Sequence, residues 1–95
     1  MRIKVRKISE DEKKKMKIPS RPSAADGWNV WECEPSKFNW RYDDEEWAYL
    51  YQGSVRIETP EGNAEAQAGD FVIFPAGLSC SWNVLEKVVK VYLFQ

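Results

Sequence analysis

The sequence predicts an all-β domain, an antiparallel barrel or sandwich with one short helix near the N-terminus. From Trp28 onward, roughly eight to ten short segments of strand-like composition follow one another, separated by closely spaced turns. Several of these segments alternate apolar and polar side chains, as strands with one buried face do. Glycine and proline mark the turns between them, and the chain has no internal repeat.

Length and composition indicate a single domain, spanning residues 1–95. A chain of 95 residues is too short for a second core, but its 43% hydrophobic residues and five tryptophans can build one. The net charge of −1 gives no general case for binding nucleic acid or an anionic membrane. The basic run at residues 13–17 has no interleaved aromatic residue, so we expect no nucleic-acid partner.

The distribution of charged and sulfur-containing residues favours a cytoplasmic protein. The N-terminal residues are charged from Arg2 to Lys7, unlike a signal peptide, and no segment approaches the ~20 apolar residues of a membrane span. Cys33 and Cys80 are far apart and lack the spacing of metal ligands. We therefore expect free thiols in a reducing compartment and no membrane partner.

Residues 1–27 are predicted to form an accessory segment, and residues 28–95 the barrel. Ile3 and Val5 alternate with basic residues, which is typical of an edge strand over residues 1–7. Ser9 and Glu12 have the spacing of a capping box, so a short helix should follow and end by Ile18. Proline, serine and glycine then predict a loop up to residue 27.

The barrel strands are expected at residues 28–33, 37–42, 46–52, 54–59, 64–67, 71–74, 79–84 and 88–94. Gly53 permits a sharp bend between two of them, and residues 60–63 form a hairpin turn. Alternation places Phe38, Trp40 and Tyr42 on one face of their strand.

Two glycine-anchored segments carry the most informative pattern. In the first, six residues separate Glu46 from Gly53; in the second, Gly69 and Asp70 precede an apolar strand and the turn Pro75-Ala-Gly77. These resemble the two signature motifs of the cupin superfamily. Trp82, Lys90 and Tyr92 further resemble the small single-domain, DUF861-type group that contains ureidoglycine-aminohydrolase-like cupins. The resemblance implies a small antiparallel cupin β-barrel, also described as a double-stranded β-helix or jelly roll.

The resemblance also implies a metal site built from histidines, but this chain contains no histidine. The family's ligand positions fall at Trp40, Tyr42, Glu46 and Cys80. One carboxylate and one thiol suit manganese, iron and nickel poorly, and zinc normally takes three or four protein ligands. We therefore expect no metal and no other cofactor; a metal, if bound, would use Glu46, Cys80 and Tyr42.

The same resemblance suggests an aromatic pocket inside the barrel, suited to a small polar or cationic ligand. Its expected ligand-binding residues are Trp40, Tyr42, Glu46, Cys80, Trp82 and Tyr92, with Lys90 beside them. Strand alternation places Ala48 and Leu50 on the face of Glu46. It leaves open whether Lys90 and Tyr92 face inward or whether residues 89, 91 and 93 do.

The leading hypothesis is a small-molecule-binding cupin of unassigned ligand. The alternative is an enzyme resembling ureidoglycine aminohydrolase or ureidoglycolate lyase, acting on a small ureido or amino compound, with Glu46 as general base and Lys90 as a second catalytic residue. Simpler interpretations stay open. The aromatic residues can be core filling, Glu46 and Lys90 a satisfied ion pair, and Cys80 an inert thiol, since no histidine activates it.

A second aromatic row, formed by Trp47, Tyr49 and Tyr51, should face out of the barrel. Three large rings on one face would make a substantial apolar patch if exposed. Either the N-terminal strand or a second subunit must cover them. We expect a homodimer through this face, which also allows a third hypothesis, a dimeric structural or interaction module.

Overall fold

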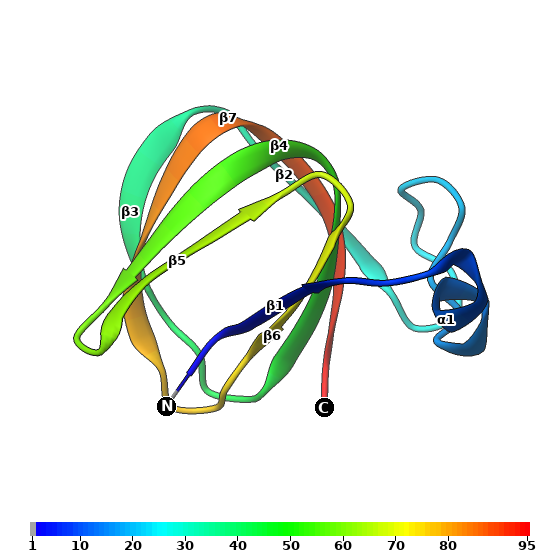
Figure 1. The fold of residues 1–95 in the computed structure, drawn as a ribbon, viewed down its shortest axis with the longest axis horizontal. Helices are drawn as coiled ribbons and strands as arrows, with labels where there is room; N and C mark the ends of the chain where they lie inside the picture. Colours follow the sequence, from blue (N-terminus) through cyan, green and yellow to red (C-terminus); the bar gives the residue numbers. More distant parts are fainter. Residues whose placement is uncertain (1) are drawn as a thin grey trace.

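The computed structural model describes residues 2–95, and its strands form one sheet that curls around a common interior (Figure 1). The sheet has seven strands in the order β1-β6-β4-β7-β2, with β3 paired to β7 and β5 paired to β4, and all the pairs are antiparallel. This confirms the predicted all-β cupin barrel. The elements are β1 (Lys4–Lys7), α1 (Glu10–Lys15), β2 (Asn29–Cys33), β3 (Ser36–Arg41), β4 (Glu46–Thr59), β5 (Gly62–Gln67), β6 (Asp70–Phe74) and β7 (Ser79–Phe94).

Two long strands, β4 and β7, form the spine of the barrel and pair with each other along most of their length. On its other edge, β4 pairs first with β6 and then with β5. The other edge of β7 pairs first with β3 and then with β2. The sequence predicts more and shorter strands, with breaks near residue 53 and at residues 85–87. In the structure, β4 and β7 continue through these positions.

The spine bends at an irregularity around Gly53. The pairing of β4 with β7 shifts register between Leu50 and Val55. Gly53 has φ of 92°, and a Cβ atom there would lie 2.0 Å from the carbonyl oxygen of Lys87. The bulge also changes which residues face inward, because Leu50 before it and Val55 and Ile57 after it all belong to the same buried cluster.

Buried side chains form two clusters, one on each side of the spine. We call the barrel interior the inner cluster; it contains Ala48, Leu50, Phe74 and Trp82 among others. The outer cluster consists of Ile18, Trp28, Tyr49, Phe71 and Val91. Both faces of the last strand are therefore packed, since Tyr92 packs against the inner cluster while Val91 belongs to the outer one.

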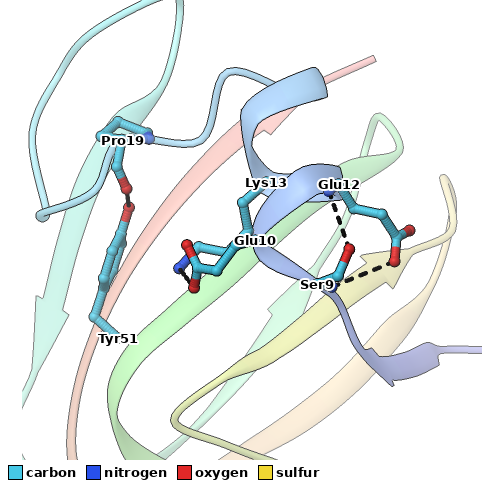
Figure 2. Close-up of polar contacts among 6 residues, drawn as sticks. All are labelled: Ser9, Glu10, Glu12, Lys13, Pro19 and Tyr51. Atoms are coloured by element: carbon cyan, nitrogen blue, oxygen red, sulfur yellow. Dashed lines mark hydrogen bonds and ion pairs between the residues drawn. The ribbon is translucent and has the colours of Figure 1, made fainter.

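The predicted capping box of helix α1 is confirmed. The Ser9 hydroxyl accepts a hydrogen bond from the backbone N–H of Glu12 at 3.2 Å, and the Glu12 carboxylate accepts one from the backbone N–H of Ser9 (Figure 2). The helix ends at Lys15, and Lys17 then adopts a left-handed conformation with φ of 58°. Within residues 2–95, no helix is long and apolar enough to cross a membrane.

The N-terminal segment covers the outer aromatic row. Ile18 packs in the outer cluster, and the ammonium of Lys13 lies 4.6 Å from the centre of the Tyr49 ring. The Tyr51 hydroxyl donates a hydrogen bond to the carbonyl of Pro19 (Figure 2). Tyr49 is only 8% exposed as a result. The row is therefore not the open patch from which the homodimer was inferred, and the homodimer stays a prediction.

Candidate ligand-binding site

A pocket of about 130 Å³ enters the barrel interior. Its walls are aromatic and its charged residues are Glu46 from the start of β4 and Lys90 from β7. Strands β2 and β3 and the residue just after β3 contribute one part of the wall, and β7 the other. The aromatic lining residues are Trp31, Phe38, Trp40, Tyr42, Trp82, Tyr92 and Phe94.

Glu46 and Lys90 form a buried ion pair on adjacent strands. The Lys90 ammonium donates a hydrogen bond to Glu46 Oε2 at 2.8 Å, and the two side chains are 6% and 5% exposed, lysine first. Both charges lose most of their hydration here, so each needs the other to remain charged inside the barrel. This contact answers a question the sequence left open, because Lys90 does reach Glu46.

The Lys90 ammonium also lies among four aromatic rings. Its distances to the ring centres are 4.7 Å for Trp82, 4.9 Å for Trp31, 5.4 Å for Tyr92 and 5.6 Å for Phe74. Ring faces attract cations at such distances. Of the four aromatic residues predicted for the pocket, Trp82 and Tyr92 are among these rings, and Trp31 and Phe74 are the other two. We call these four rings the aromatic cage, and the protein's own lysine occupies it.

Opposing effects act on the protonation of Lys90. Burial lowers its pKa, because an ammonium is disfavoured away from water, whereas the Glu46 carboxylate raises it. Burial dominates, so the pKa of Lys90 lies below its ordinary value. The lysine can therefore lose its proton more easily than a surface lysine can.

Tyr42 supplies a hydroxyl to the same pocket. Its backbone N–H donates to the carbonyl of Leu78, and its carbonyl accepts from the N–H of Gly77, so the Pro-x-Gly turn fixes its position. The Tyr42 hydroxyl accepts a hydrogen bond from the Trp82 indole N–H at 3.1 Å. Burial, together with the nearby Glu46 carboxylate, raises the pKa of Tyr42 well above its usual value. The hydroxyl thus stays protonated and can donate to a bound molecule.

The structure brings together most of the residues predicted from the sequence. Trp40, Tyr42, Glu46, Trp82, Lys90 and Tyr92 all line the pocket.

Cys80 is placed differently. It is buried in the inner cluster beside the pocket, opposite Trp40 in the β3–β7 pairing, but it is not one of the pocket's lining residues. Burial raises the pKa of its thiol to about 11, and Glu46 adds to this effect. A protonated buried thiol is a poor nucleophile.

Trp31, Phe38 and Phe94 also line the pocket, although they were not predicted from the sequence. Alternation could have found two of them, because Phe38 shares the face of Trp40 and Tyr42, and Phe94 follows Tyr92 by two residues. Trp31 could be recognised as a lining residue only from the strand register, which pairs it directly with Lys90.

The donor set at this position does not fit a divalent metal. Glu46 already binds the Lys90 ammonium, whose charge would repel a second cation. No group of three histidine, cysteine or acidic side chains that could hold a metal occurs in the part of the chain that the structure describes. The expectation that the protein works without a metal stays a prediction.

A family comparison agrees with the fold and the motifs. The model of the EutQ-like cupin domain matches residues 21–92. This chain belongs to the EutQ-like cupin family. A DUF861 family protein from Thermotoga maritima has 35% sequence identity and a TM-score of 0.86, with 99% of this chain and 100% of that chain covered. These matches confirm the resemblance to small DUF861-type cupins.

More distant structures show the same fold as this EutQ-like cupin. The EutQ protein of Clostridium difficile has 20% identity and a TM-score of 0.64, covering 68% of this chain and 52% of that one. A mutant of Bacillus subtilis oxalate decarboxylase has 21% identity and a TM-score of 0.58, covering 70% and 20%. No curated protein matches the chain.

Proposed function

We propose that this cupin binds a small, ring-sized polar molecule in its aromatic pocket. The observation that carries the proposal is an apolar pocket whose buried end holds a hydrogen-bonded Glu46–Lys90 pair. Small-molecule sites typically combine apolar walls with a few polar groups that fix the ligand's orientation. At the rim, Trp40 and Phe94 are 51% and 52% exposed, and large aromatic side chains left half in solvent are available to cover a ligand.

The pocket volume sets the size of the ligand. An engineered apolar cavity of about 150 Å³ binds benzene. The present pocket, at about 130 Å³, is slightly smaller but opens to solvent between its rim residues. It therefore suits one planar ring, or a chain of similar size, with a polar group that enters first.

The polar groups of the pocket set the ligand's chemistry. Lys90 and Tyr42 offer hydrogen-bond donors and Glu46 offers an acceptor, while the ion pair is neutral as a whole. A carboxamide or urea group carries both an acceptor and a donor. It can therefore accept a hydrogen bond from Lys90 or Tyr42 and donate one to Glu46 at the same time. A cationic ligand fits less well than the sequence alone suggested, because Lys90 already occupies the aromatic cage.

Benzamide, benzoate and benzylamine test this proposal, because they present an amide, an anion and a cation on the same ring. We expect benzamide to bind most tightly and benzylamine most weakly when heats of binding are measured by calorimetry. Trp40→Ala should weaken benzamide binding by up to about tenfold, since an aromatic contact contributes about 0.5–1.5 kcal/mol.

Leu85→Ala is the matched control, because Leu85 is also 51% exposed but lies outside the pocket. It should leave the benzamide affinity unchanged. Equal affinities for all three compounds, or equal losses in the two variants, would mean that binding occurs elsewhere on the surface.

The other two hypotheses have less support. An enzyme that uses Glu46 as a free general base requires an uncommitted carboxylate, whereas Glu46 is bound to Lys90. An interaction module that uses the outer aromatic row requires an open patch, whereas the N-terminal segment covers Tyr49. Light scattering at micromolar concentration tests the predicted homodimer separately from ligand binding.

A further inference from the structure

We propose that Lys90 reacts reversibly with small aldehydes or ketones that enter the pocket, forming an imine at its Nζ atom. This inference rests on the proposed function, because it concerns the same pocket and names a class of ligand for it. It goes beyond that function in giving Lys90 a covalent role.

The position of the Lys90 amine favours its reaction with a carbonyl group. Lys90 Nζ lies at the inner end of an apolar pocket, beside a carboxylate that can take its proton across a single 2.8 Å hydrogen bond. Only an unprotonated lysine can attack a carbonyl carbon, and desolvation is one of the ways in which proteins make lysine nucleophilic. Burial acts in this direction on Lys90.

The surroundings of Lys90 also suit the charge of the product. An iminium product carries its positive charge on the same nitrogen as the ammonium that it replaces. Trp31 and Trp82, with ring centres within 4.9 Å of that nitrogen, and the Glu46 carboxylate would therefore stabilise it as they stabilise the ammonium. Aromatic walls would also limit the entry of water, which hydrolyses imines.

The reaction balances with groups already in the pocket. The Lys90 ammonium gives one proton to the Glu46 carboxylate, and the amine lone pair forms a bond to the carbonyl carbon. A proton moves from the nitrogen to the former carbonyl oxygen, giving a neutral carbinolamine. Glu46 then returns its proton to that hydroxyl group, the C–O bond breaks and water leaves. The products are an iminium ion, one water molecule and the original carboxylate.

A second lysine provides an internal control. Lys13 Nζ also lies over an aromatic ring, 4.6 Å from the centre of Tyr49, and forms an ion pair with Glu10 at 3.3 Å. It lies outside the pocket, and its hydrogen-bonding partners raise its pKa, against the effect of burial. Both lysines contact an aromatic ring and form an ion pair, but only Lys90 lines the pocket. We therefore expect Lys90 to react with the aldehyde and Lys13 not to.

The test uses benzaldehyde, which has the shape of benzamide, with cyanoborohydride to reduce any imine to a stable benzyl amine. Intact-mass and peptide mass spectrometry then locate the benzyl groups after short reaction at neutral pH. We expect Lys90 to be modified faster than Lys13, because burial lowers the pKa of Lys90 and so leaves more of it as free amine, whereas the pKa of Lys13 is raised. Benzamide should slow the labelling of Lys90 alone.

Lys90→Arg and Lys13→Arg complete the design. The first should remove the rapid label, with near-ultraviolet circular dichroism checking that the variant is folded, and the second should leave it unchanged. Labelling of all lysines at similar rates, while benzamide still binds, would overturn the imine but leave the proposed function standing. Absence of benzamide binding, with no rapid label at Lys90, would overturn both.

Discussion

Lys90 Nζ donates a hydrogen bond to Glu46 Oε2 at 2.8 Å, inside the barrel and between its two spine strands. The pair links the first cupin motif, which contributes Glu46, to the final strand, which contributes Lys90. It also determines the character of the pocket, because it puts a cation and an anion where related cupins are expected to hold a metal. Stability, ligand choice and reactivity at this site therefore depend on the same contact.

Removing one partner of the pair should be costly. Lys90→Met or Glu46→Leu alone should each lower the free energy of unfolding by about 3–5 kcal/mol, because each leaves an unpaired charge in the core. The free energy of unfolding of the double variant should fall by much less than the sum of the two single decreases, since well-packed apolar residues can replace a buried pair. Urea denaturation of the four proteins measures this coupling. Additive losses would contradict the account, because they would mean that the two charges do not depend on each other.

Stability should fall with pH above about 9, in part because of Cys80. The pKa of Cys80 is raised from 9.0 to about 11 in the folded protein. At about pH 8 and below, the thiol is almost entirely protonated in both states. Between pH 9 and 11 the unfolded thiol ionises while the folded one does not, which favours unfolding.

The Cys80→Ala variant isolates this effect. The difference in unfolding free energy between the native protein and Cys80→Ala should decrease from about pH 8 to pH 11. Denaturant titrations in reducing buffer at several pH values measure it. A difference that stays constant over this range would show that the thiol ionises equally easily in both states.

Gly53 should tolerate no side chain. Gly53→Ala would place a Cβ atom 2.0 Å from the Lys87 carbonyl oxygen, so the spine would have to move. We expect a loss of more than about 1 kcal/mol in thermal or chemical unfolding. Gly27→Ala is the control, because Gly27 has a similar φ of 87° but has nothing within 4 Å of the added atom. Equal losses in the two variants would assign the effect to backbone conformation alone.

The N-terminal segment should contribute to stability through Ile18. Ile18 is 7% exposed and packs in the outer cluster, so Ile18→Ala should lower the free energy of unfolding by about 2 kcal/mol or more. Val30→Ala, at a position that is 38% exposed, should cost much less. Similar small effects in the two variants would mean that the segment lies only loosely on the outer row.

The fold was predictable because its signals are local. The turn residues, the capping box at Ser9 and Glu12, and the two glycine-anchored motifs, one from Glu46 to Gly53 and one from Gly69 to Gly77, each lie within a short stretch of the sequence. The continuity of β4 and β7 was not predictable, because it depends on pairing between strands distant in the sequence. Alternation alone also fails across Gly53, where the bulge shifts the inward positions from Leu50 to Val55.

The site was predictable in part for the same reason. Trp40, Tyr42 and Trp82 could be placed from alternation and family resemblance, whereas Trp31 becomes a pocket residue only through its pairing with Lys90. For the outer aromatic row, the direction of the side chains was predictable but their burial was not. Its outward direction followed from the pattern of β4, but its covering by Ile18 depends on how the N-terminal segment folds back.

An NMR titration of the tryptophan indole N–H signals with benzamide tests most directly whether a ligand binds inside the barrel. The protein has five tryptophans, and Trp31, Trp40 and Trp82 line the pocket. Trp28 and Trp47 belong to or pack against the outer cluster. We predict saturable shifts of the three pocket signals, with the other two unchanged. Shifts confined to Trp28 and Trp47, or no saturable shift at the pocket signals, would contradict a binding site inside the barrel.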